Sequence, residues 1–140
     1  MPFTDEECRY LKGHAIGRLA TVSSSGEPDI SAVSYRIHDG HICIGGLDAA
    51  RSIKYRNVVA TGRVAFVVDD SDASDRRGPR GLKIHGSGDI IAGPGGAPEI
   101  RIIPGDIWSW GLNRVDEPFR GDEPYLVEMD MVKDSGCSPV

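Results

Sequence analysis

The chain has 140 residues, which is the length of one domain and excludes a two-domain dehydrogenase with its own substrate domain. Its 16 basic and 21 acidic residues give a net charge of −5, which argues against nucleic acid or an anionic membrane as the main partner. The acidic N-terminus is unlike a signal peptide, and no apolar run approaches the roughly 18 residues of a spanning helix, so we expect a cytoplasmic protein. The scattered Cys8, Cys43 and Cys137 are then expected to be free thiols.

The first half of the chain predicts two short helices around three strands. Thr4 and Glu7 have the spacing of a capping box, which starts a helix that stops at Gly13. Alternating apolar residues predict the strands, and Asp39 with the following glycine predicts a hairpin turn between the second and third. Asp48 is a good N-cap for the second helix. The predicted elements are a helix over 4–12, strands over 16–22, 30–37 and 41–45, and a helix over 49–60.

The second half predicts more strands and two loops. A charged loop over 69–80 is long enough to have a function, and Pro104 with the following glycine is expected to break one strand into two. Six or seven strands with short connections favour an antiparallel sheet, and a closed barrel over an open one. The predicted elements are strands over 64–68, 82–91, 100–103, 107–110 and 125–132, loops over 92–98 and 113–124, and a loose tail over 135–140.

The start of the second helix carries the strongest chemical signal. Two glycines end the preceding strand, and Arg51, Ser52, Lys54 and Arg56 then follow within six residues. Exposed amides, the helix dipole and cationic side chains together suit a phosphate group. The alternative is a solvated basic helix face.

Two further signals lie on strands. Arg18 interrupts an apolar strand, so it needs a partner or an anionic ligand unless its long stem reaches water at a sheet edge. Trp110 beside Gly111 offers a flat face against which a planar ring can stack. The alternative for both tryptophans is packing in the core, which we expect more for Trp108 than for Trp110.

Metal binding is not predicted. His38, His41 and Cys43 surround a hairpin turn, but their spacing fits no standard zinc pattern and no second cluster completes it. His85 lies in the middle of a strand, where a histidine with its hydrogen bonds satisfied, or one exposed to solvent, is more common than a catalytic base.

Together these motifs resemble the pyridoxamine phosphate oxidase-like superfamily of flavin and deazaflavin oxidoreductases, and within it the actinobacterial branch that uses coenzyme F-420. The resemblance covers residues 4–112, so residues 1–112 are taken as the core and 113–140 as a C-terminal extension of the same domain. It rests on residues 17–22, 26–28, 45–57, 63–70, 79–81, 100–102 and 109–111.

The resemblance implies a mainly β split barrel with two or three short helices, which forms a homodimer with cofactor at the subunit interface. The first strand would line the ring of the cofactor, the second would flank it, the basic helix start would hold the phosphate, and the tryptophan would come from the partner subunit. The implied cofactor-binding residues are Arg18, Leu19, Ala20, Thr21, Val22, Val33, Ser34, Tyr35, Arg51, Ser52, Lys54, Tyr55, Arg56, Trp110 and Gly111.

The chain departs from the family pattern at three places. Ile53 precedes Lys54 where the family usually has two lysines, and Arg51 is positioned to replace the missing charge. Thr61 and Gly62 stand where Asn-Pro is usual, and residues 71–77 lack a common tryptophan. These changes suggest a specialised substrate.

The resemblance implies a reductase that passes a hydride from reduced F-420 to an electron-poor C=C or C=N bond of a small organic substrate. A quinone, an enone and a natural-product intermediate fit this chemistry, and some small reductases of tetracycline-type biosynthesis have this fold. Tyr35, His85 and solvent are the candidate proton donors. An FMN-dependent oxidoreductase of the same fold and a non-catalytic cofactor carrier are the alternatives.

Overall fold

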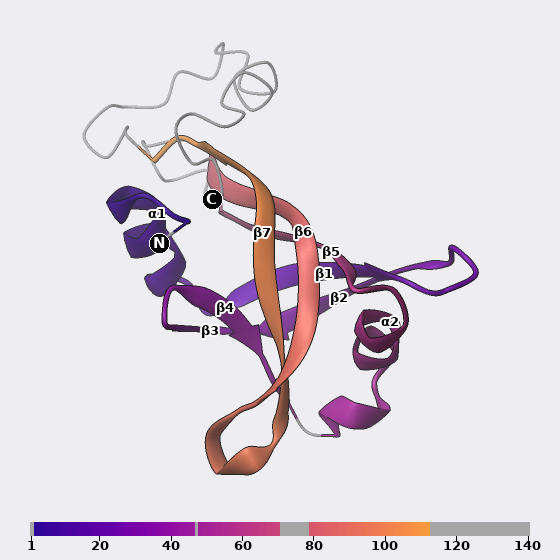
Figure 1. Cartoon of the computed structure of the whole chain (residues 1–140). Helices are drawn as coiled ribbons and strands as arrows, with labels where there is room; N and C mark the ends of the chain where they lie inside the picture. Colours follow the sequence, from indigo (N-terminus) through magenta and orange to yellow (C-terminus); the bar gives the residue numbers. More distant parts are fainter. Residues whose placement is uncertain (1, 47, 71–78, 113–140) are drawn as a thin grey trace.

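The fold is a curled antiparallel sheet of seven strands with two α-helices beside it (Figure 1). The computed structural model describes residues 2–46, 48–70 and 79–112. The elements are α1 (Asp5–Lys12), β1 (Ile16–Val22), β2 (Pro28–Ser34), β3 (Arg36–His38), β4 (His41–Ile44), the 3-10 turn η1 (Ala49–Arg51), α2 (Ile53–Thr61), β5 (Arg63–Asp70), β6 (Arg80–Ala92), the 3-10 turn η2 (Pro94–Gly96) and β7 (Pro98–Trp110).

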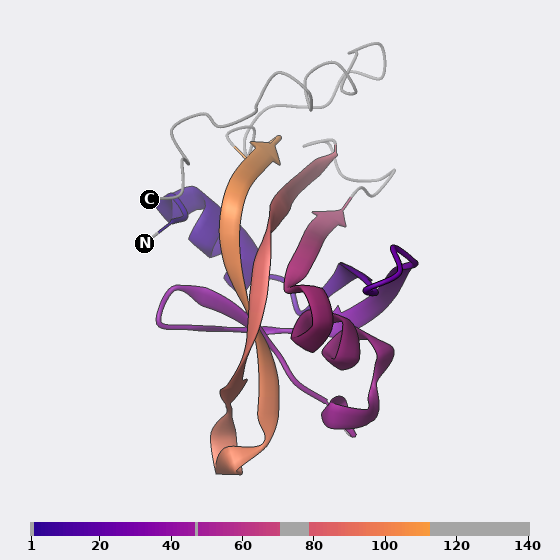
Figure 2. The same ribbon diagram turned by 45° about the vertical axis from the view of Figure 1, so that its right-hand side comes forward.

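The strand order explains the curled shape. The order is β2-β1-β5-β6-β7-β4-β3, so the two edge strands are consecutive in the chain and only Tyr35 separates them. Among the described strands β2 and β3 do not pair with each other, so the sheet is a half-barrel and not the fully closed barrel expected above. The mainly β split-barrel class is confirmed. In both views α1 and α2 lie on opposite sides of the long β6–β7 pair (Figures 1 and 2).

The core fills the concave side of this sheet. Leu19, Leu82 and Ile84 are fully buried there, each with 0% of its surface exposed. The ring of Phe66 passes close over β1, where a Cβ at Gly17 would stand 2.3 Å from the ring, so this position accepts only glycine. Alternation on each strand then leaves the opposite side chains on the outer face.

Several predicted boundaries are wrong. The expected strand over 30–37 is β2 and β3, with the chain turning at Tyr35 from one edge of the sheet to the other. β5 runs to Asp70 and β6 begins at Arg80, so both ends of the predicted charged loop are strand. The predicted break at Pro104 is a bulge inside one continuous strand, because the pairing skips Gly105 between His85 and Gly86.

Other predictions hold or lie outside the described residues. The capping box of α1 is present in full, with Thr4 and Glu7 exchanging two hydrogen bonds. Cys8 and Cys43 are buried free thiols. The predicted elements over 113–140, most of the charged loop and Cys137 fall in residues that the structure does not describe. In the described ranges no helix has the length and apolar character needed to cross a membrane.

Candidate functional site

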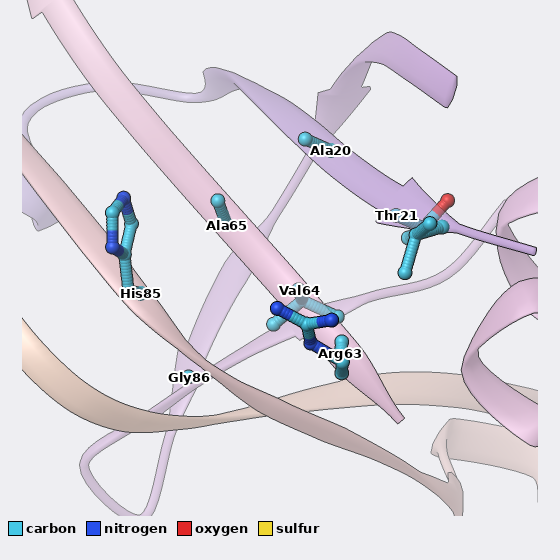
Figure 3. A pocket seen from close by; sticks show the side chains of 8 residues that line it. Ala20, Thr21, Arg63, Val64, Ala65, His85 and Gly86 are labelled. Atoms are coloured by element: carbon cyan, nitrogen blue, oxygen red, sulfur yellow. The ribbon is translucent and has the colours of Figure 1, made fainter. Parts of the chain in front are cut away.

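A pocket of about 330 Å³ opens on the outer face of the sheet, where β1, β5 and β6 lie side by side (Figure 3). Its floor consists of small residues, because the register sets Ala20 opposite Ala65 and Ala65 opposite His85. Short side chains in adjacent strands leave a flat surface against which a planar ring can lie. The lining residues are Ala20, Thr21, Val22, Arg63, Val64, Ala65, His85 and Gly86.

The polar side chains of this pocket come from β5 and β6. Figure 3 shows Arg63 and His85 at different sides of Ala65, with Ala20 beyond it on β1. Both polar side chains are exposed, and Arg63 has no carboxylate partner among the described residues. The sequence reasoning did not select Arg63 as a site residue, although the alternation of Arg63, Ala65 and Val67 with buried neighbours marks an outward-facing row.

The predicted ring-lining residues of β1 divide between the two faces of the sheet. Ala20 and Val22 line the pocket, and Arg18 lies on the same outer face, with its guanidinium 3.9 Å from the carboxylate of Asp69. Leu19 is fully buried in the core, so a ligand on the outer face can reach only its backbone. Thr21 is also buried, and its hydroxyl accepts a hydrogen bond from the Asn57 side chain.

The residues of the second strand that were predicted to flank the cofactor ring lie away from the pocket. Val33 is buried in the core, and Ser34 is exposed near the sheet edge opposite Ile16. Tyr35 donates a hydrogen bond from its hydroxyl to the carbonyl oxygen of Leu11 at 2.6 Å. Burial raises the pKa of Tyr35 to about 12, so its proton is held firmly.

Tyr35 belongs to a separate cavity of about 310 Å³ between α1 and β3, which does not include His85. The structure therefore distinguishes the two candidate proton donors. His85 faces the open pocket on the outer side, whereas the Tyr35 hydroxyl donates a hydrogen bond to the Leu11 carbonyl oxygen in the other cavity.

The basic segment before and within α2 adopts a capped helix start. The residue that caps α2 is Ser52 and not Asp48, because the Ser52 hydroxyl accepts from the Tyr55 amide at 3.2 Å and donates to the Ala49 carbonyl at 2.7 Å. Asp48 has a positive φ of 54° and makes no capping hydrogen bond. The prediction of one helix from residue 49 is corrected to η1 followed by α2.

This helix start gathers positive charge. Arg51 and Arg56 are exposed, Lys54 and Tyr55 are half-buried, and none of the three basic residues has a carboxylate partner in the described part of the chain. The first amides of the helix and three basic residues therefore lie within one short segment, a combination that suits phosphate. The phosphate role remains a prediction.

Helix α2 is fixed to the strand that lines the pocket. Asn57 donates to the Thr21 hydroxyl at 3.0 Å, and Thr61 donates to the carbonyl oxygen of Val22 at 3.0 Å. Gly62 ends the helix with a φ of 67°, a conformation that favours glycine. These bonds join the second half of α2 to β1, one of the three strands that line the pocket.

The two tryptophans differ in exposure, and the stacking role of Trp110 stays a prediction. Trp110 is buried, and its ring covers Gly81, where a Cβ would stand 2.3 Å from a ring atom. Trp108 is the half-buried one and lies on the outer face with His85 and Lys83. Gly111 has a φ of 72° and packs against Arg80.

The histidines of the β3–β4 hairpin do not form a metal cluster with Cys43. His38 and His41 lie opposite each other, whereas Cys43 is buried and pairs in register with Arg36. In the described ranges no group of three potential ligands comes together.

Comparison with known proteins identifies relatives across most of the chain. The family model described as pyridoxamine 5'-phosphate oxidase matches residues 3–100. A 5a,11a-dehydrotetracycline/5a,11a-dehydrooxytetracycline reductase of Streptomyces rimosus is 43% identical over 123 residues, which cover 80% of this chain and 85% of the relative.

Solved structures share the fold at lower identity. A conserved hypothetical protein of Mycobacterium tuberculosis has a TM-score of 0.68 at 21% identity, covering 89% of this chain and 94% of its own. An FAD binding protein of Mycobacterium smegmatis has a TM-score of 0.58 at 15% identity, covering 75% and 92% respectively. At these identities the likeness supports the fold alone.

Proposed function

Because this chain belongs to the pyridoxamine 5'-phosphate oxidase family, we propose that it is a reductase that takes a hydride from reduced coenzyme F-420 and delivers it to an electron-poor C=C bond of a planar polycyclic substrate. The observation that carries the proposal is the dehydrotetracycline reductase at 43% identity. That relative is named for reducing dehydrotetracyclines, and we extend this class, a planar polycycle with a reducible C=C bond, to the substrate of this chain.

The residues present suit a phosphate-bearing planar cofactor. Ala20, Ala65 and Gly86 leave a flat floor, and α2 is tied to the same strand with its basic start. Cations that lack a protein partner in the described ranges favour an anionic ligand, because an unpaired charge near the surface gains most from an opposite charge. Arg51 supplies a guanidinium beside Lys54, which offsets the single lysine at this helix start.

Each group has a defined task in this proposal. When bound, reduced F-420 supplies a hydride and is oxidised by two electrons as the C=C bond is reduced. Arg51 and Lys54 hold the phosphate, and the small floor keeps the ring flat against the sheet. The second carbon of the reduced bond needs a proton, and in this proposal His85, which lines the pocket, donates it from a ring N–H.

The proposal includes a homodimer. Ile16, Ile30 and Ile103 are large apolar side chains that are 38–68% exposed, and the register places them on the face that carries the pocket. A second copy that covers this face would bury them and close the pocket from water. The small chain would then build a complete site from two subunits.

A cofactor screen tests the proposal. We expect calorimetry and fluorescence to detect F-420 binding to wild-type protein. The double variant Arg51→Ala, Lys54→Ala should bind F-420 at least about tenfold more weakly, because each of the two substitutions removes a charge-assisted hydrogen bond to the phosphate. Arg9→Ala removes an exposed cation of α1 and serves as the matched control with unchanged affinity.

Turnover then separates the alternatives. Reduction of a dehydrotetracycline-type acceptor by reduced F-420 supports the reductase. If the protein purifies yellow and turns over only with FMN, then FMN and not F-420 is its cofactor. If it binds F-420 tightly but reduces no acceptor, it is a cofactor carrier. Absence of F-420 binding contradicts the proposal.

A further inference from the structure

Lys83 and His85 on β6 both contact the indole of Trp108 on β7. The Nζ atom of Lys83 lies 4.5 Å from the centre of the indole ring, and the imidazole of His85 meets the indole edge-on, with ring centres 4.7 Å apart. His85 lines the pocket, and Lys83 lies two residues along the same strand on the same face. Of these three side chains only His85 lines the pocket; Lys83 and Trp108 lie next to it on the same face and extend the border that His85 begins.

The charge of Lys83 differs from that of most cations in the sheet. Four arginines each have a carboxylate at 3.9 Å or less, whereas no ion pair of Lys83 or Arg63 is present in the part of the chain that the structure describes. Both of these unpaired cations lie on the outer face that carries the pocket. The paired residues are Arg18 with Asp69, Arg36 with Glu99, Arg80 with Asp70, and Arg101 with Asp89.

Trp108 holds the ammonium group without neutralising it. A cation over an indole face gains about 0.5–2 kcal/mol, which restricts a flexible lysine side chain but leaves its charge available. A group that is already restricted loses less freedom when it binds an anion. Asp106, which the register sets opposite His85, is an acidic residue exposed on this face, and it forms no ion pair with Lys83.

The shape and charge of this border indicate what it contacts. The alanine floor is taken by the cofactor ring in the proposed function, so the indole of Trp108 is the apolar surface left for fused substrate rings, and the ammonium group offers one positive charge beside it. Enol groups of 1,3-dicarbonyl compounds and acidic phenols ionise in neutral water and carry their negative charge on oxygen at the edge of a ring. A planar polycycle with such an oxygen matches both features.

Building on the proposed function, we propose that Lys83 selects the substrate: its ammonium pairs with an ionised enol or phenol oxygen of the polycyclic acceptor, while Trp108 fixes the ammonium and borders the substrate rings. The pairing draws electron density from the conjugated C=C bond, which favours acceptance of the hydride. Lys83 is therefore a specificity-determining residue of the same site, distinct from the cations at the start of α2.

The test measures ligand binding and does not require turnover. Tetracycline is the probe with an ionised enol oxygen, an O-methylated tetracycline that lacks this oxygen charge is the methylated probe, and calorimetry gives the dissociation constants with F-420 present. For Lys83→Gln we expect about a tenfold weaker binding of tetracycline, equivalent to about 1.4 kcal/mol, and no loss of affinity for the methylated probe. Lys83→Arg keeps the charge and should stay within about threefold of wild type.

Two controls separate this inference from the proposed function. F-420 affinity should be unchanged in Lys83→Gln, and tetracycline affinity should be unchanged in Arg9→Gln. If wild-type protein does not bind F-420 but Lys83→Gln still loses tetracycline selectively, the cofactor is wrong and the role of Lys83 stands. No tetracycline binding by wild type, or equal losses for both probes in Lys83→Gln, overturns the role of Lys83.

Discussion

Asp70 is a residue on which several side chains from different elements converge. Tyr10 of α1 donates to its Oδ1 atom at 2.5 Å, Arg80 of β6 donates to its Oδ2 atom at 3.0 Å, and His14 lies 3.3 Å away. Burial alone would raise the pKa of Asp70, but the hydrogen bonds from Arg80 and Tyr10 and the nearby positive charge lower it below the ordinary value of 3.8. The ionised carboxylate therefore fastens α1 to the ends of β5 and β6.

This arrangement predicts a loss of stability in acid. An acid whose pKa is lower in the folded state stabilises the fold above its unfolded pKa, and that contribution disappears as the pH falls through the folded pKa. At pH 7 we expect Asp70→Asn to lower the free energy of unfolding by about 1–3 kcal/mol, and at pH 3 the difference from wild type should shrink. Urea unfolding at both pH values measures it.

Asp106→Asn is the control for that prediction. Asp106 is exposed and has no ion pair among the described residues, so its variant should match wild type at both pH values. A constant difference between wild type and Asp70→Asn from pH 3 to pH 7 would contradict the role of the ionised carboxylate.

At the scale of single residues the sequence could name candidates but could not rank them. Tyr35 and His85 were equal as proton donors because both are titratable residues on strands. The structure separates them, because the Tyr35 hydroxyl donates its hydrogen bond to the Leu11 carbonyl oxygen, whereas His85 lines the pocket. The difference depends on what each side chain meets across the sheet, which no local pattern contains.

Helix α2 couples stability to the candidate phosphate site through its N-cap. Ser52 accepts from the Tyr55 amide and so orders the first turn, beside the basic side chains. We expect Ser52→Ala to lower the free energy of unfolding by about 1 kcal/mol, and to weaken F-420 binding because the exposed amides lose their alignment. Thermal unfolding and calorimetry give the two quantities.

Thr4→Ala provides the matched control for Ser52. Thr4 caps α1 with the same kind of hydrogen bond, but α1 does not line the pocket. Its variant should lose similar stability with unchanged F-420 affinity. Equal effects of both variants on binding would mean that Ser52 acts only through overall stability.

At the scale of elements, the sequence predicted the type of most segments and misplaced several boundaries. Alternation and caps identified α1, β1 and β4 because these signals depend on neighbours a few residues apart. Pro104 suggested a break, yet β7 continues because a bulge opposite His85 and Gly86 accommodates it. The long β6–β7 pairing overrides the local signal.

At the scale of the whole molecule, the exposed apolar face predicts association. Ile30 is 68% exposed and lies opposite Ala20, on the pocket side of the sheet. We expect wild-type protein to sediment as a dimer and Ile30→Glu to sediment as a monomer, because an unpaired carboxylate in a dry interface is costly. F-420 binding should weaken together with dimerisation if the site needs both subunits.

Val59→Glu is the comparison for that variant. Val59 is 64% exposed on α2, so the same charge is introduced at a similar exposure away from the pocket face. It should remain a dimer. A wild-type monomer, or a dimer that survives Ile30→Glu, contradicts the proposed interface.

The sequence by itself determined the class of this protein. Its short length and strand periodicity indicated one mainly β domain, and the resemblance of its motifs to the pyridoxamine phosphate oxidase-like superfamily implied a split-barrel oxidoreductase, because these features depend on local spacing and on motif order along the chain. The family match over residues 3–100 confirms that class.

Only the tertiary structure decided which side chains share a surface. The curl of the sheet brings Ala20, Ala65 and His85 together from three strands and sends Leu19 into the interior. It also sets Lys83 over Trp108, a contact between strands whose residues are 25 positions apart in the chain. Register between distant strands fixes such neighbours, and register is a property of the packed sheet as a whole.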